Sequence, residues 1–268
     1  MFQHAIITHG GSGSDPQDSD GPQSAARIGM EILEKEGSAL MAVVRAVRFL
    51  EDDPRFNAGI GSQLRADGRT IQMDASCMLS TGEFGAVACV EETQNPIEIA
   101  QGILLHSPHI LLMGDGARCF AKVHNIPIVG LRDDDARTAH SNDILPSCDT
   151  VGAVAYDGKV FAAALSSGGL QGAALGRVGD VPLPGCGLFC GPVGAVACTG
   201  DGESIALKLL AKEVYGWLER KMNPSQAAEK AMTLFDKSVD VGLIILNHNE
   251  FASLARNGMA WSHLLESY

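Results

Sequence analysis

The stretch TVGAVAYDGKVFAAAL, residues 150–165, decides the fold of this chain. It consists of two apolar runs joined by Asp157-Gly158. An Asp-Gly pair between two such runs is typical of a β-hairpin, because glycine allows the backbone conformation that a tight turn requires. The sequence therefore predicts two buried strands with Thr150 at the start of the first.

The residues before this hairpin have a different character. Residues 131–149, LRDDDARTAHSNDILPSCD, are charged and polar and follow neither a helical nor a strand period. Such a segment is typical of an exposed linker. Thr150 is thus expected at the junction between an exposed linker and a buried strand.

On both sides of this junction, apolar periodicity predicts a mixture of strands and helices. Each half of the chain is expected to pack its helices on antiparallel sheets. Strands are expected at residues 4–8, 70–78, 84–90, 109–113, 195–198, 241–246 and 251–255, and helices at residues 23–35, 38–52, 95–106, 114–124, 203–221 and 224–238.

Composition and charge exclude several classes of function. The chain has 268 residues and a formal net charge of −12, which opposes binding to nucleic acid or to an anionic membrane. No apolar run approaches the roughly 20 residues that span a bilayer, and no secretory signal is evident. Its seven cysteines show no metal-binding or disulfide spacing. We therefore expect a cytoplasmic protein with reduced thiols.

Four segments place glycines beside an isolated hydroxyl, amide or charge. The first, HGGSGS at residues 9–14, follows a strand as a phosphate-binding loop would, but it lacks the lysine of that motif. Each segment alone is compatible with a simple turn. The other three are FNAGIGS at 56–62, SSGGLQGAALGRVGD at 166–180 and CTGDGE at 198–203.

Taken together and in order, these segments resemble the isoaspartyl peptidase/L-asparaginase family over nearly the whole chain. The resemblance rests on HGG (9–11), FNAGIG (56–61), MDAS (73–76), Asn95-Pro96, TVGAVA (150–155), SSGG (166–169), GRVGD (176–180) and CTGDGE (198–203). It implies an α/β (α+β) fold, the four-layer αββα sandwich of the N-terminal-nucleophile hydrolases. It also implies a homodimer and a single domain, residues 1–268.

The resemblance assigns the nucleophile to Thr150. A threonine hydroxyl needs a base, and its own α-amino group, with a pKa of about 8, serves if the Asp149–Thr150 bond is cut. Self-cleavage there would give segments 1–149 and 150–268. Catalysis by this route requires no cofactor.

The resemblance also assigns roles around the nucleophile. Thr199 and the backbone N–H of Gly200 would form the oxyanion hole, and Ser167 would orient Thr150. Asn57 would contact the new amine. Gly11 would contribute backbone to the floor of the site.

Substrate binding is expected from a charged pair in an otherwise apolar, glycine-rich stretch. Arg177 and Asp180 suit the α-carboxylate and the α-ammonium of a free amino acid, and Gly202 would let the backbone approach the ligand. The alternative is an ordinary surface salt bridge between these two residues.

Residues 50–60, LEDDPRFNAGI, resemble a loop that wraps a structural sodium ion in some family members. A hydrogen-bonded turn without metal is an equal alternative. The expected ligands are backbone carbonyls, which suit a hard cation, from Leu50, Glu51, Asp53, Phe56, Ala58 and Ile60.

The expected activity is hydrolysis of β-aspartyl dipeptides and L-asparagine. Two departures keep alternatives open: a serine at position 167, where the family commonly has threonine, and LQGAAL at 170–175, where relatives often carry lysine and proline. The alternatives are a glycosylasparaginase, an endopeptidase similar to threonine aspartase, and an uncleaved homologue that binds without catalysis.

Overall fold

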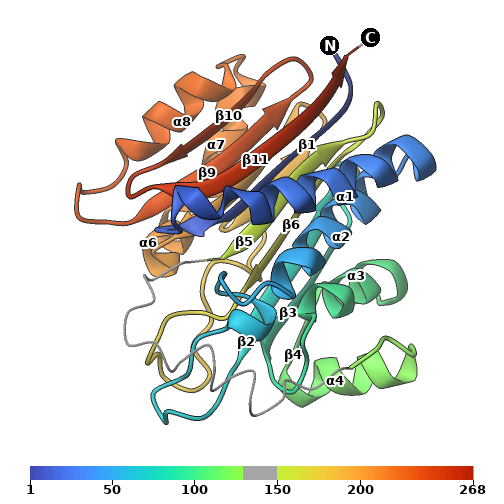
Figure 1. Ribbon diagram of the computed structural model, residues 1–268, viewed down its shortest axis with the longest axis vertical. Helices are drawn as coiled ribbons and strands as arrows, with labels where there is room; N and C mark the ends of the chain where they lie inside the picture. Colours follow the sequence, from blue (N-terminus) through green and yellow to red (C-terminus); the bar gives the residue numbers. More distant parts are fainter. Residues whose placement is uncertain (129–149, 268) are drawn as a thin grey trace.

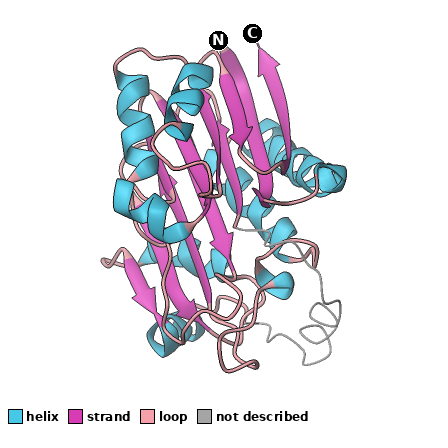
Figure 2. Cartoon of the chain, turned by 90° about the vertical axis from the view of Figure 1, so that its left-hand side faces the viewer, coloured by secondary structure: helices cyan, strands magenta, loops and turns pink. Residues whose placement is uncertain are grey.

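The computed structural model describes residues 1–128 and 150–267, and within these ranges two β-sheets pack between two layers of helices (Figure 1). Viewed at 90° to this direction, helices lie on either side of the strands (Figure 2). The predicted four-layer αββα arrangement is confirmed.

The larger sheet has seven strands among the described residues, in the order β11-β1-β5-β6-β2-β3-β4. Its pairs are antiparallel except for β3 with β4. The strands are β1 (Phe2–Ser12), β2 (Met73–Leu79), β3 (Phe84–Val90), β4 (Leu111–Met113), β5 (Val151–Tyr156), β6 (Phe161–Ser167) and β11 (Met259–Ser267).

The smaller sheet has the order β10-β9-β8-β7 and is antiparallel throughout. Among the helices that the structure describes, none is both long and apolar enough to cross a bilayer. The strands are β7 (Leu188–Gly191), β8 (Gly194–Gly200), β9 (Val241–Asn247) and β10 (Phe251–Ala255); the helices are α1 (Asp20–Glu36), α2 (Ala39–Glu51), α3 (Pro96–His106), α4 (Gly114–Val123), α6 (Gly202–Lys208), α7 (Leu210–Glu219) and α8 (Pro224–Met232).

The predicted hairpin at residues 150–165 forms β5 and β6 and is buried on both faces. Val151, Ala153 and Ala155 belong to the core under α1, α2 and α3, whereas Val154 and Tyr156 belong to the core between the two sheets. A strand with two buried faces needs apolar residues at consecutive positions. This explains the unbroken apolar run that the sequence shows here.

Strands from the two described ranges, 1–128 and 150–267, are interleaved in the larger sheet. Strand β5 lies between β1 and β6, and β11 pairs with the other edge of β1. Phe2 is paired with Ser267, so the two ends of the described chain lie side by side (Figure 1).

The structure corrects the prediction in three places. The single helix expected at residues 203–221 is two helices, α6 and α7, because Leu209 adopts a left-handed conformation with a φ of 48°. Two strands were not predicted at all. Strand β7 lies inside a glycine-rich stretch, and β11 is a partly exposed edge strand whose apolar pattern is weak.

Candidate active site

Thr150 lies at the end of the larger sheet where β1, β5 and β6 meet. Its side chain is buried, and β5 begins with the next residue. The pairs His9–Gly152 and Val151–Ser166 fix the register. Extending the β5–β6 register places Thr150 opposite Ser167, whereas Gly11 lies in the irregular part of β1 between His9 and Ser12.

The backbone of Thr150 has a φ of 26°. A β-branched residue rarely adopts a positive φ, and such strain is often found at functional sites. Asp149, the residue on the other side of the predicted cleavage site, lies outside the described residues.

Ser167 and Asn57 are brought together by the turn that follows β6. The Ser167 Oγ accepts a hydrogen bond from the N–H of Gly169 at 3.0 Å, and Asn57 Nδ2 donates to the Gly169 carbonyl at 2.7 Å. The N–H of Gly168 donates to the backbone carbonyl of Asn57 at 3.0 Å. The two residues that the sequence placed beside the nucleophile therefore share one turn.

The smaller sheet contributes Thr199 and Gly200, at the end of β8. The N–H of Ser12 donates to Thr199 Oγ1 at 3.0 Å, which joins this strand to the end of β1. Gly200 has a φ of 128°, and a Cβ there would lie 2.3 Å from the carbonyl oxygen of Asp240. Only glycine fits this position.

The structure places Arg177 and Asp180, the two residues expected to bind the substrate, beside Gly202. A Cβ on Gly202 would lie 2.8 Å from both Arg177 Nη2 and Asp180 Oδ1. The two charged residues do not form the alternative salt bridge with each other. Arg177 instead pairs with Glu203, through Nε at 2.8 Å and Nη2 at 2.6 Å.

Asp180 is a buried carboxyl group with an oxygen that lacks a hydrogen-bond partner among the described residues. That oxygen is Oδ2, and the residue is 4% exposed. Burial raises its pKa to about 7, although the nearby Arg177 partly opposes this shift. A buried carboxyl with an unused oxygen is suited to a cationic ligand.

His9 is buried beside the start of β5 and is neutral at physiological pH. Burial lowers its pKa to about 3. A Cβ on Gly152 would lie 2.3 Å from His9 Nε2, so the ring packs closely on the strand that carries Thr150. A histidine with so low a pKa is a poor general base near neutrality.

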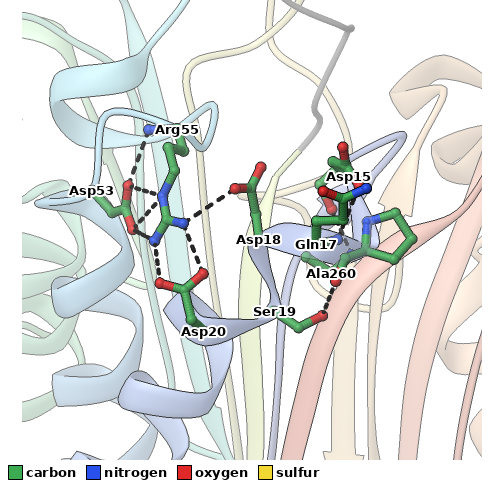
Figure 3. A network of polar contacts seen from close by, with 10 residues as sticks. Asp15, Gln17, Asp18, Ser19, Asp20, Asp53, Arg55 and Ala260 are labelled. Atoms are coloured by element: carbon green, nitrogen blue, oxygen red, sulfur yellow. Dashed lines mark hydrogen bonds and ion pairs between the residues drawn. The ribbon is translucent and has the colours of Figure 1, made fainter.

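The FNAGIG segment packs against the HGG segment and the start of α1. The Phe56 ring lies against both Gly10 and Gly21. Next to it, Arg55 bonds to Asp53, Asp18 and Asp20, at 2.7, 3.2 and 2.8 Å (Figure 3).

Arg65 and Asp74 lie close to the turn that follows β6, and the sequence did not indicate either of them as a site residue. Arg65 is 1% exposed and donates to the Gln72 carbonyl at 2.6 Å, while its Nη1 would lie 2.9 Å from a Cβ on Gly169. Asp74 is paired with Ser167 across the sheet and accepts a hydrogen bond from Cys89 at 2.8 Å. Arg65 lies in a polar segment that gave no sign of burial.

The loop expected to hold sodium is compact. Gly59 would place a Cβ 2.1 Å from the Glu51 carbonyl. Four of the six expected carbonyls, those of Leu50, Asp53, Phe56 and Ala58, accept backbone hydrogen bonds within the loop. A carbonyl oxygen has a second lone pair, so these bonds are compatible with a cation. The sodium site stays a prediction.

Comparison with known proteins agrees with this geometry. The chain matches the family described as Asparaginase over residues 2–142 and 132–263. It is 35% identical to the isoaspartyl peptidase/L-asparaginase of Danio rerio, over 96% of this chain and 91% of that protein. It is also 35% identical to the plant-type L-asparaginase of Pyrococcus furiosus, over 94% and 93%. The isoaspartyl peptidase/L-asparaginase of Rattus norvegicus is 37% identical, over 90% and 80%. Its sequence, its layered fold and the matching regions together show that the chain belongs to the asparaginase family.

Proposed function

We propose that this protein is a self-cleaving amidohydrolase that uses Thr150 to hydrolyse β-aspartyl dipeptides and L-asparagine. The observation that carries the proposal is that Arg177 and Asp180 both lie beside Gly202, at the same end of the molecule as three buried hydroxyl residues. Membership of the asparaginase family supports the reaction class.

The reaction begins once the Asp149–Thr150 bond is cut. The freed α-amine of Thr150 takes the hydroxyl proton while Oγ attacks the side-chain carbonyl of the substrate. The negative charge that develops on the carbonyl oxygen is stabilised by the Thr199 hydroxyl and the Gly200 N–H. The leaving amine takes the proton and departs, and Asn57 orients it. Water then hydrolyses the ester, which restores Thr150.

The substrate's free amino-acid end is held by opposite charges. The α-ammonium lies against Asp180, whose unused oxygen gains a partner, and the α-carboxylate lies against Arg177. An aspartyl residue inside a protein has no free ammonium, so this arrangement favours small substrates over protein cleavage. Glycosylated asparagine carries the same free end and is distinguished only by assay.

Intact mass and N-terminal sequencing of freshly purified protein test the proposal. Fragments 1–149 and 150–268 are expected, together with ammonia release from L-asparagine and aspartate release from a β-aspartyl dipeptide. Thr150→Ala should stay in one piece and be inactive, with Thr233→Ala as the control for a surface hydroxyl. A wild-type chain that stays whole and does not turn over either substrate would contradict the proposal.

We also propose a homodimer of cleaved protomers, in the cytoplasm. Exposed apolar side chains on neighbouring elements support a contact surface: Leu105 at the end of α3, Ile110 and Met113 around β4, and Val123 at the end of α4. Sedimentation equilibrium tests this assembly. A monomer at micromolar concentration would contradict it.

A further inference from the structure

Ser12 is the last residue of β1, and it contacts the smaller sheet through Thr199. It is fully buried, and the pairing of β1 with β11 is irregular between His9 and Ser12. Its N–H donates to Thr199 Oγ1 at 3.0 Å, and its own hydroxyl donates to Asp240 Oδ1 at 2.6 Å. One residue thus links the oxyanion threonine to a carboxylate.

Asp240 contacts the other side of the oxyanion segment with its backbone. Its carbonyl oxygen accepts the N–H of Asp201 at 2.8 Å. The same oxygen lies 2.3 Å from where a Cβ on Gly200 would be. Asp240 therefore holds Ser12 through its side chain and the Gly200–Asp201 backbone through its main chain.

These contacts determine where the Thr199 proton points. A hydroxyl offers one hydrogen and two acceptor lone pairs. The Ser12 N–H occupies one lone pair, so the hydrogen must point elsewhere and is left for the substrate oxyanion. An oxyanion donor contributes fully only if it is aimed before the charge develops.

We propose that Ser12 and Asp240 are positioning residues that orient the Thr199 hydroxyl and the Gly200 N–H toward the oxyanion. This inference rests on the proposed function. It adds a charge-assisted hydrogen bond between Ser12 and Asp240, two residues that do not touch the substrate. Such bonds are stronger than neutral ones, and a donor fixed in place costs no reorganisation during the reaction.

The test compares Asp240→Asn and Ser12→Ala with wild type, at equal amounts of cleaved protomer, on L-asparagine and a β-aspartyl dipeptide. Loss of a whole oxyanion donor costs about 100- to 1000-fold in kcat, so misorientation should cost about 10-fold. KM should change less than about 2-fold, because the contacts of the substrate's free end remain. Ser12→Thr, which keeps the hydroxyl, should restore most of the rate.

The double variant Ser12→Ala/Asp240→Asn should be no slower than either single variant, because the two residues act as one unit. Asp236→Asn is the matched control, since its carboxylate makes no hydrogen bond within the described chain. A purely structural link between the sheets would lower the thermal midpoint and leave kcat unchanged, which would overturn the inference. An inactive wild type would instead refute the proposed function. If Ser12→Ala fails to fold, Asp240→Ala decides alone, because it removes the acceptor of the Ser12 hydroxyl, whereas asparagine keeps an acceptor oxygen there.

Discussion

Replacing Asp180 with asparagine should stabilise the protein at the same time as it removes function. Asp180 is buried with one oxygen unsatisfied, and its pKa is raised to about 7 from a usual 3.8. A carboxyl whose pKa is higher in the folded state makes folding less favourable once the unfolded chain ionises it. Asparagine has nearly the same shape but cannot ionise, so Asp180→Asn removes this cost.

The sign and size follow from the two pKa values. The cost is absent well below pH 3.8, grows as the pH rises, and is complete above about pH 7, where it reaches about 4 kcal/mol. At pH 5 it amounts to about 2 kcal/mol by the same relation. The stability advantage of Asp180→Asn should therefore widen by about 2 kcal/mol between pH 5 and pH 8.

Urea unfolding at pH 5, 6, 7 and 8 measures this difference. Both proteins should carry Thr150→Ala, so that self-cleavage cannot differ between them. In the cleaved enzyme, Asp180→Asn should raise KM for L-asparagine at least about 10-fold, because the ammonium loses its counter-charge. A stability difference that does not vary with pH would refute the reasoning, since it would mean that Asp180 titrates as an ordinary carboxyl.

Three further predictions concern packing and charge around the site. Gly202→Ala should raise KM at least about 10-fold, because its methyl group would lie 2.8 Å from both Arg177 Nη2 and Asp180 Oδ1 and would displace these two groups; an unchanged KM would argue against a ligand there. Gly10→Ala should lower the free energy of unfolding by about 1–3 kcal/mol, since its Cβ would meet the Phe56 ring at 2.3 Å; urea unfolding measures this loss, and a neutral effect would contradict such close packing. Arg55→Met should lower the free energy of unfolding by about 1 kcal/mol in dilute buffer and by less in 1 M salt, because it leaves Asp18, Asp20 and Asp53 without their shared cation. Urea unfolding at both salt concentrations measures this, and a loss that does not depend on salt would mean that packing dominates.

The parts of the fold that could be predicted from sequence are those with local signals. The hairpin of β5 and β6 was marked by Asp157-Gly158. Helix α2 begins directly after Ser38, whose side chain accepts a hydrogen bond from the N–H of Met41, and serine is a residue that commonly caps helices. The break at Leu209 had no such signal, because a left-handed leucine is imposed by tertiary packing. Strand β11 pairs with β1 from the far end of the chain, and no local pattern reports a partner so distant.

The candidate site shows the same division. Glycine-rich segments indicated Asn57, Thr199 and Gly202, because turns that bring backbone close to a ligand have a recognisable composition. Thr150 was indicated by the family resemblance and by its place between a polar linker and a buried strand. The partner of Arg177 could not be predicted, since Asp180 lies three residues away in sequence whereas Glu203 approaches it from another element. The contact between Ser12 and Asp240 forms only because the two sheets stack. The sequence around either residue contains no local signal that predicts this contact.

The interleaving of strands in the larger sheet determines how strongly segments 1–149 and 150–268 are joined if the chain is cut before Thr150. The new amino terminus would lie directly before β5, which is paired with β1 and β6. Strand β1 would remain paired with β11 on its other edge. To separate, the pieces would have to give up three ladders of hydrogen bonds: β1 with β11, β1 with β5, and β2 with β6. Dilution alone could not drive such a separation. Cleavage would thus be a maturation step after which the two polypeptides stay associated and are degraded together as a single protein.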